Sequence, residues 1–370
     1  MKEEAKEPVE TGLAPVSEGK VVKREQQAPG VVTEYMEDGT KVVTINLSEI
    51  DEDSLPEKYV AEVILEAPIL ESSQADSKTR RTPAGTFQAG EEGRLCYQDV
   101  SIDGKGNIYI LDSCNASVTV YNNQGKMTGI IPVENVYSQN EDGRVKSHKT
   151  EIKTGGNRIY LRDTVKNRIE AIDEAGKVLE TIDIPEEIEG KRTREMRMWA
   201  DEEGVGVGSD GRKSRFEKGK WVRKESAARG ENRERREEKN QMAYAQVLNN
   251  VIKLNQDTLR LESSVLRITE MGNDNSGNKY FRVSAGKKEE RGVLKYSDAG
   301  QVKVFIRDTP FWWDEKWKDG CEQILPFLSG GIAANVLLSK NGTVYLTQRL
   351  CCSSEANCVS KIRIIAFKKR

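Results

Sequence analysis

The sequence predicts an all-β fold, a six-bladed β-propeller of four-stranded antiparallel blades, with a disordered N-terminal tether. Two observations support this prediction: short strands separated by tight turns, and the recurrence of that pattern along the chain. Residues 101–126, SIDGKGNIYILDSCNASVTVYNNQGK, alternate apolar and polar side chains in short runs. Between the runs stand Gly, Asn and Asp, which favour hairpin turns because they adopt positive φ or bond back to the chain.

The pattern recurs in four clear copies and one degenerate copy, at residues 106–126, 156–177, 277–301, 341–367 and, degenerate, 203–221. Aligned on the strand at the start of each copy, they place five residues at equivalent positions: Tyr109, Tyr160, Gly206, Tyr280 and Tyr345. A unit of about 45 to 50 residues therefore recurs, twice with extra sequence inserted, which is typical of propellers.

A four-stranded unit cannot bury both of its faces alone, so the units are expected to pack face to face around an axis. Residues 31–66 and the C-terminal run KIRIIAF supply further strands. A sixth blade shared between the two chain ends would close the ring and cover its edges.

The predicted domains are a flexible tether at 1–30 and a propeller at 31–370, with insertions at about 225–242 and 310–327. The tether begins MKEEAKEPVETGLAPVSEGK, which is too poor in apolar residues to fold alone. Two interpretations stay open: Met1 replaces a removed export signal or lipid-anchor segment, or the stretch is an ordinary disordered tail.

The charge balance argues against a polyanionic partner. The chain has 58 Lys and Arg against 60 Asp and Glu, so we expect no nucleic-acid binding. The insertion at 225–242 mixes both signs and interleaves no aromatic residue, which favours a solvated connection. No apolar run approaches the roughly 18 residues that a transmembrane helix requires.

The stretch VSIDGKGNIYILDSCNASVTVYNNQGK resembles the NHL repeat. The residues that match its pattern are Asp103, Gly106, Asn107, Ile108, Tyr109, Ile110, Asp112, Asn115, Val118, Val120 and Gly125. The second copy keeps Gly156, Asn157, Tyr160, Asp163, Asn167, Ile169 and Gly176. In later copies the turn Asp becomes Ser209, Val283 and Gln348. The resemblance implies a six-bladed NHL-like propeller, a class that contains lyases, lactonases and binding modules, so function must come from the site.

An enzymatic site has little support in the sequence. The single histidine, His148, lies in the loop VKSHKTE and is expected to be exposed, which excludes a His-rich zinc site. NDNSGN at 273–278 has the composition of a calcium loop, but without the spacing of an EF-hand it is better interpreted as a hairpin turn. Asp112 and Asp163 are expected to cap their own turns. We therefore predict no catalytic residues, metal ligands or cofactor, with calcium as the alternative.

The six cysteines suit a disulfide set in an exported protein, and none forms a Cys-x-x-Cys metal pair. Cys351 or Cys352 would pair with Cys358, and Cys96 with Cys114; a vicinal Cys351–Cys352 bond is a further alternative. The competing interpretation is six reduced thiols in a cytoplasmic protein.

Two regions are predicted to bind a partner. Trp312, Trp313 and Trp317 gather on one side of a short turn, either as an interface or as packing over the propeller mouth. The residues two and three positions beyond the shared Tyr end their strands. They are expected to surround one mouth of the propeller, where charge-assisted contacts would hold an acidic ligand. The candidate residues there are Arg162, Asp163, Arg282 and Gln348, together with the neighbouring Arg349.

The sequence favours a non-enzymatic NHL-like propeller, tethered outside the cytoplasm in the cell envelope or secreted, that binds a protein or another envelope component. The alternative is a calcium-dependent propeller hydrolase or lyase with its site in the central funnel.

Overall fold

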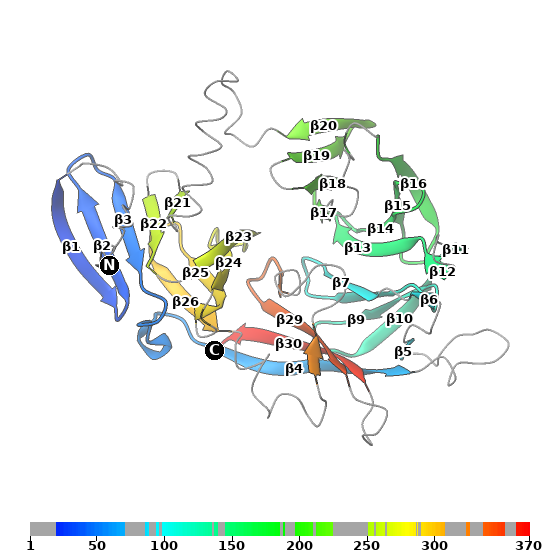
Figure 1. The fold of residues 1–370 in the computed structure, drawn as a ribbon, viewed down its shortest axis with the longest axis horizontal. Coiled ribbons are helices and arrows are strands. Elements are labelled where there is room, and N and C mark those ends of the chain that lie inside the picture. The colour runs from blue at the N-terminus through cyan, green and yellow to red at the C-terminus, as the bar shows by residue number, and fades with distance from the viewer. Residues whose placement is uncertain are drawn as a thin grey trace, which may run out of the picture.

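In the residues that it describes, the computed structural model has thirty strands and one short 3-10 helix, Glu52–Ser54. The residues that it describes are 20–70, 86–88, 94–95, 98–134, 137–139, 145–185, 188, 197–209, 212–224, 251–254, 257–262, 265–285, 287, 290–307, 323–325, 336–351 and 360–370. Their strands form seven sheets, six of which have at least four strands (Figure 1).

Four of these sheets consist of four consecutive antiparallel strands. The first is β7 (Gln98–Ile102), β8 (Ile108–Asp112), β9 (Ser117–Tyr121) and β10 (Met127–Pro132). The second is β13 (Lys149–Gly155), β14 (Arg158–Asp163), β15 (Arg168–Ile172) and β16 (Val178–Asp183). The third is β17 (Arg197–Asp201), β18 (Gly204–Ser209), β19 (Arg212–Glu217) and β20 (Lys220–Lys224). The fourth is β23 (Val265–Asn273), β24 (Lys279–Ala285), β25 (Gly292–Tyr296) and β26 (Val302–Arg307).

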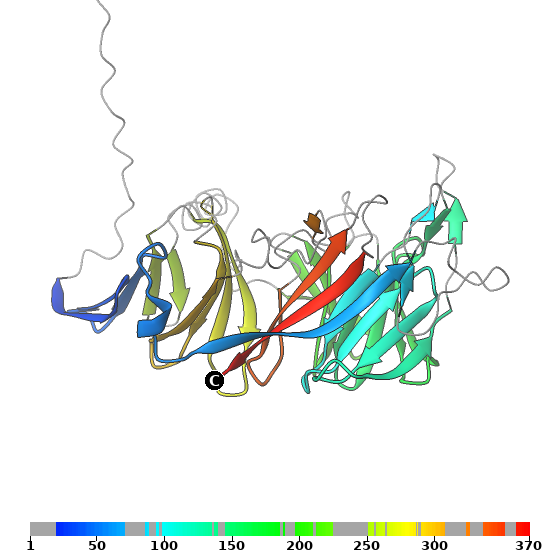
Figure 2. The same ribbon diagram turned by 90° about the horizontal axis from the view of Figure 1, so that it is seen from below.

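A further sheet joins the two ends of the chain, as predicted. The C-terminal strand β30 (Lys361–Lys369) pairs antiparallel with β4 (Tyr59–Leu70), and the two run together across the molecule (Figure 2). The remaining strands of this sheet are β5 (Phe87–Gln88), β27 (Gln323–Leu325), β28 (Val336–Leu338) and β29 (Val344–Cys351).

The N-terminal strands correct the predicted tether boundary. β1 (Val21–Ala28), β2 (Val31–Met36) and β3 (Lys41–Ile45) form a meander whose third strand pairs in parallel with β22 (Asp257–Leu261). The fifth strand of this sheet is β21 (Val251–Leu254). Residues 21–28 therefore belong to the folded protein rather than to a tether. A small separate sheet contains β6 (Arg94–Leu95), β11 (Tyr137–Gln139) and β12 (Val145–Ser147).

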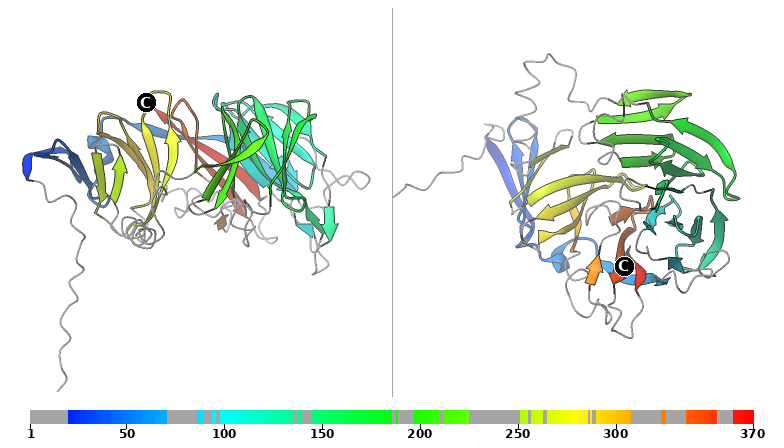
Figure 3. Two further views of the ribbon diagram at one scale, coloured as in Figure 1. Left: turned by 90° about the horizontal axis from the view of Figure 1, so that it is seen from above. Right: turned by 45° about the vertical axis from the view of Figure 1, so that its right-hand side comes forward.

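The sheets stand around a common centre, which makes the fold a β-propeller (Figures 1 and 3). Five buried hydrophobic clusters fill the spaces between neighbouring sheets. For example, Tyr160 of β14 packs with Met198 of β17 and Val205 of β18. Among the described residues, none of the five clusters joins the β17–β20 sheet to the sheet of β1–β3, β21 and β22. These two sheets are the ends of the described ring.

The sequence of β18 explains this difference. Val205 and Val207 point into the cluster shared with the β13–β16 sheet, so Gly204, Gly206 and Gly208 occupy the opposite face of the strand. The Trp199 ring covers Gly206, where a Cβ would lie 2.2 Å from the indole. On this face β18 therefore contributes no side chains, and the Trp199 ring of the neighbouring strand covers it instead.

The predicted register is confirmed. Tyr109, Tyr160, Gly206, Tyr280 and Tyr345 each lie on the second strand of their sheets. Because the strands alternate in direction, the second and fourth strand of each sheet finish at the same end. The connections that leave this end include residues 133–148, 184–196 and 225–250, whereas the opposite end has turns of two or five residues. We call these the long-connection end and the short-turn end.

Candidate functional site

The long-connection end of the β13–β16 sheet has a row of charged side chains with alternating sign. Lys149 on β13 lies opposite Asp163 on β14, which lies opposite Arg168 on β15. Arg168 in turn lies opposite Asp183 on β16. The register places these opposite charges on neighbouring strands, but the carboxylate that pairs with Lys149 and Arg168 is that of Glu170.

Two sets of ion pairs lie on the same strands, in or next to this row. The Glu170 carboxylate accepts hydrogen bonds from Lys149 and from Arg168, and both Lys149 and Glu170 are buried. Arg162 Nη1 lies 3.2 Å from Glu151 Oε2. Because charges removed from water are stable only when paired, these contacts are part of the fold as well as candidates for recognition.

Asp163 and Asp112 cap equivalent turns, which confirms the prediction for both. Asp163 Oδ1 accepts hydrogen bonds from the backbone N–H of Val165 at 3.1 Å and of Lys166 at 2.7 Å. Asp112 Oδ1 accepts from Cys114 at 3.0 Å and from Asn115 at 3.1 Å. Repeat structure explains the recurrence of the aspartate at these positions.

The predicted arginine rim needs correction. Arg162 and Arg282 are only 4% and 2% exposed. Each lies two residues beyond a tyrosine that packs between sheets, and side chains two apart on a strand share a face. Arg162 therefore points toward the β17–β20 sheet and Arg282 toward β28–β30. Both belong to interfaces between blades rather than to an exposed mouth.

The remaining candidates at this end divide between buried and accessible. Gln348 is fully buried and follows Leu346 on the face that packs against the β23–β26 sheet. Arg349 lies on the other face of β29 and is half-buried. Its Nε atom is buried and has no hydrogen-bond partner among the described residues. Arg349 is thus the accessible basic group of the predicted set.

His148 was expected to be exposed, and that expectation is wrong: the residue is 5% exposed. Its backbone carbonyl accepts a hydrogen bond from the Thr164 N–H at 3.0 Å. Its ring lies beside Asp163, with 3.7 Å between Nδ1 and the carboxylate Oδ1. The turn after β14 therefore holds the histidine inside the long-connection end.

The first strands of neighbouring sheets are joined by side chains that accept backbone hydrogen bonds. Asp99 of β7 accepts from Ile152 N–H of β13 at 2.9 Å, and Ser101 accepts from Thr154 N–H at 2.9 Å. Glu151 of β13 accepts in the same way from Met198 N–H of β17 at 3.0 Å. Acidic residues near the axis are thus used to align blades, a role that the sequence analysis missed.

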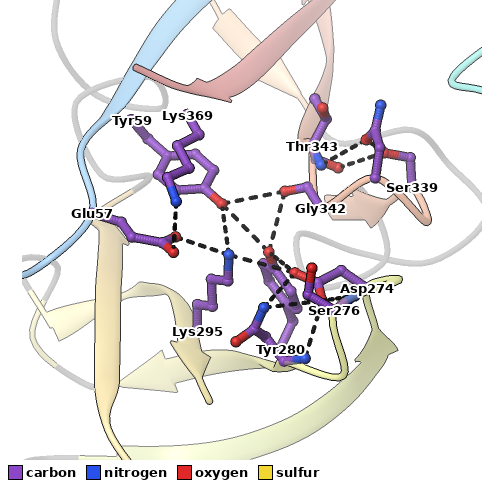
Figure 4. A network of polar contacts seen from close by, with 12 residues as sticks. Glu57, Tyr59, Asp274, Ser276, Tyr280, Lys295, Ser339, Gly342, Thr343 and Lys369 are labelled. Atoms are coloured by element: carbon purple, nitrogen blue, oxygen red, sulfur yellow. Dashed lines mark hydrogen bonds and ion pairs between the residues drawn. The ribbon is translucent and has the colours of Figure 1, made fainter. Parts of the chain in front are cut away.

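A second polar network lies at the short-turn end, where β4, the β23–β26 sheet and the end of β30 meet (Figure 4). Lys295 Nζ lies 2.8 Å from Glu57 Oε2 and 3.4 Å from Asp274 Oδ2. The Tyr280 hydroxyl donates to Asp274 Oδ2 at 3.0 Å, and Lys369 Nζ donates to Glu57 Oε1 at 3.0 Å. The network therefore connects segments that are far apart in the chain.

The ionisation of this network follows from its contacts. Burial alone would raise the pKa of Asp274, but hydrogen bonds from Asn278 and Tyr280 and the charge of Lys295 hold it below its usual value. Burial would likewise lower the pKa of Lys295, but the hydrogen bond to Glu57 and the nearby carboxylates raise it. Burial and the contacts with Tyr59 and Asp274 raise the pKa of Tyr280. Every member thus keeps the charge that its partner requires.

The loop at 273–278 is a hairpin turn, as predicted. Asp274 Oδ1 accepts from the backbone N–H of Ser276 at 2.9 Å and of Asn278 at 3.0 Å, while Gly277 has φ +80°. Within the described residues, no group of three or more His, Cys, Asp or Glu side chains is arranged to hold a metal ion.

Several predicted residues fall outside the described part of the chain. They are Trp312, Trp313, Trp317, Cys96, Cys352, Cys358 and most of the two insertions, and the Cys351 side chain is likewise not described. Cys114, expected in an exposed turn, is 4% exposed. The cysteine pairings stay predictions, because four of the five side chains are not described.

Comparison with known proteins adds nothing to the site. No family model and no curated protein matches the sequence. Solved structures that align with it include a member of the DUF4221 family from Bacteroides vulgatus, at 9% identity and a TM-score of 0.34, covering 85% of this chain and 99% of that one. Virginiamycin B lyase from Staphylococcus aureus aligns at 11% identity and a TM-score of 0.26, covering 84% and 99%. Hsv2 from Kluyveromyces marxianus aligns at 8% and 0.33, covering 71% and 75%. These scores carry no argument about function.

In the part of the chain that the structure describes, no helix is long and apolar enough to cross a membrane.

Proposed function

We propose that the protein is a non-enzymatic, six-bladed NHL-like propeller that binds a protein or another envelope component at its long-connection end. One observation supports this site above others: the long connections of the repeated sheets all leave from that end, where Arg349 stays partly accessible. Loops on a rigid scaffold are where binding residues concentrate. A partner bearing carboxylates would suit the partly accessible guanidinium group of Arg349.

The proposed location is outside the cytoplasm. A disulfide at Cys114, which is buried, would support it, because stable disulfides form in oxidising compartments. Cys96 is the proposed partner, since the two flank the first two strands of one blade in the sequence.

Binding can be tested with a fluorescein-labelled hexaglutamate peptide as the acidic probe. Arg349→Ala should weaken probe binding about tenfold, as expected for the loss of one charge-assisted contact. Arg158→Ala is the matched control, because Arg158 is an exposed arginine at the short-turn end. Equal effects of the two substitutions would argue against the site.

The alternative is a calcium-dependent hydrolase or lyase acting in the central funnel. Isothermal titration of calcium into chelator-treated protein distinguishes the two. Tight, stoichiometric binding would favour the enzyme, and no heat of binding would favour the scaffold.

A further inference from the structure

The only histidine of the chain occupies an unusual environment. His148 is 5% exposed, and neither ring nitrogen has a hydrogen-bond partner among the described residues. Buried polar atoms are nearly always hydrogen-bonded, and an exception requires an explanation. Its nearest charged group is the Asp163 carboxylate, 3.7 Å from Nδ1, which is slightly too far for a hydrogen bond.

The Asp163 carboxylate is also buried and has few charged groups near it. It is 1% exposed, and among the described residues the only basic group within 4.0 Å of it is the His148 ring. With the ring neutral, the carboxylate is stabilised by the turn amides of Val165 and Lys166. A proton on His148 would supply the positive charge that this carboxylate lacks.

The other charged groups on the surrounding strands are already paired. Lys149 of β13 and Arg168 of β15 both contact Glu170, and Asp99 of β7 contacts Lys153. Arg162 of β14 pairs with Glu151 of β13. Lys149 and Arg168 share one carboxylate, and the other two cations have one each. Among the described residues, the acidic group that lies nearest the His148 ring is Asp163.

We propose that His148 and Asp163 form a proton-operated contact at the long-connection end. When His148 takes up a proton, Nδ1–H moves the short distance to Asp163 and donates to it, and the carboxylate then divides its bonding between the ring and the turn amides. When the proton leaves, Asp163 returns to capping the turn alone. The contact couples acidity to the turn after β14 and to the end of the 133–148 connection. It does not depend on what the long-connection end binds.

The histidine can be observed directly, because tag-free protein has one histidine Hε1 resonance in its proton NMR spectrum. Asp163→Asn removes the charge but keeps an oxygen that caps the turn. The titration midpoint of Hε1 should fall by at least about 0.5 pH unit in this variant, roughly a threefold loss of proton affinity. Asp112→Asn is the matched control, because Asp112 caps the equivalent turn in the neighbouring sheet. Equal midpoints in the two variants and the wild type would overturn the proposal.

A second measurement covers the case in which Asp163→Asn does not fold. Hydrogen exchange of the 163–168 segment, corrected for intrinsic rates, is compared at pH 5.5 and 7.5 with that of 112–117. In the wild type, protection should change with pH at 163–168 only, and His148→Gln should remove that change. If His148→Gln keeps the same pH response, the histidine is not the sensor and the proposal fails.

Discussion

The hydroxyl of Tyr280 lies against Gly342 of the next sheet, 3.3 Å from its carbonyl oxygen, while it donates to Asp274 Oδ2 at 3.0 Å. A Cβ at Gly342 would lie 2.8 Å from that hydroxyl oxygen. Tyr345 meets Gly106 of the following sheet in the same way, also at 2.8 Å. At these two interfaces the repeated Tyr and the repeated turn Gly are therefore two halves of one contact between blades.

This contact predicts a specific cost for filling the glycine. Gly342→Ala should destabilise the fold by about 1 to 3 kcal/mol more than Gly39→Ala, measured by urea unfolding. Gly39 is the matched control because it has nearly the same φ, +80° against +84°, but no atom within 4 Å of its Cβ position. Both variants suffer the backbone strain, and only Gly342→Ala suffers the clash. Equal losses would show that the tyrosine contact is unimportant.

Arg162 should matter for stability rather than only for binding. Arg162→Ala would leave the Glu151 carboxylate without its ion-pair partner in a buried interface, at a cost of about 3 to 5 kcal/mol. Arg158→Ala removes an arginine from the same strand whose side chain is 44% exposed, and should cost at most about 1 kcal/mol. Thermal unfolding of both variants tests this. An unchanged melting temperature for Arg162→Ala would instead support the prediction from the sequence that Arg162 lies on an exposed rim.

The network around Lys295 should produce a bell-shaped dependence of stability on pH. The pKa of Asp274 is lowered by folding, so its contribution is present above the usual value of 3.8 and is lost as the pH falls through the lower folded value. The pKa of Lys295 is raised, so its contribution is present below 10.5 and is lost as the pH rises through the higher folded value.

Lys295→Met tests this origin. It should lower the free energy of unfolding at pH 7 by about 3 kcal/mol, because Glu57 and Asp274 lose their shared cation. It should also flatten the alkaline side of the profile. Lys303→Met, which removes an exposed lysine of the adjacent strand, is the control. If Lys295→Met loses stability at alkaline pH in the same way as the wild type, groups other than Lys295 cause that loss.

At least one disulfide should join two of Cys351, Cys352 and Cys358. Closing so short a loop restricts the unfolded chain only slightly, so the expected stabilisation is modest, about 2 kcal/mol. The check is a thiol count on unfolded protein purified without reductant. Six free thiols would contradict the prediction.

The all-β propeller, the shared register and the turn caps could be predicted from the sequence because they depend on local patterns. Period-2 alternation and Asx-Gly turns act within a few residues, and repetition makes them visible. Asp112, Asp163 and the 273–278 turn were placed correctly for this reason. The pairing of β4 with β30 also follows, since an open ring leaves edges that the chain ends can cover.

The burial and the charge pairing of individual side chains were decided by the tertiary structure. Nothing near Arg162 or Arg282 in the sequence distinguishes an exposed strand end from a buried one; their burial depends on which sheet packs against that face. His148 lies in a polar loop, yet the turn after β14 encloses it. The glycine face of β18 lies at one end of the described ring. Which sheet occupies that end depends on how all the sheets are arranged, and the sequence of β18 does not determine it. Burial and charge pairing between distant segments are properties of the packed ring, and a local pattern does not contain them.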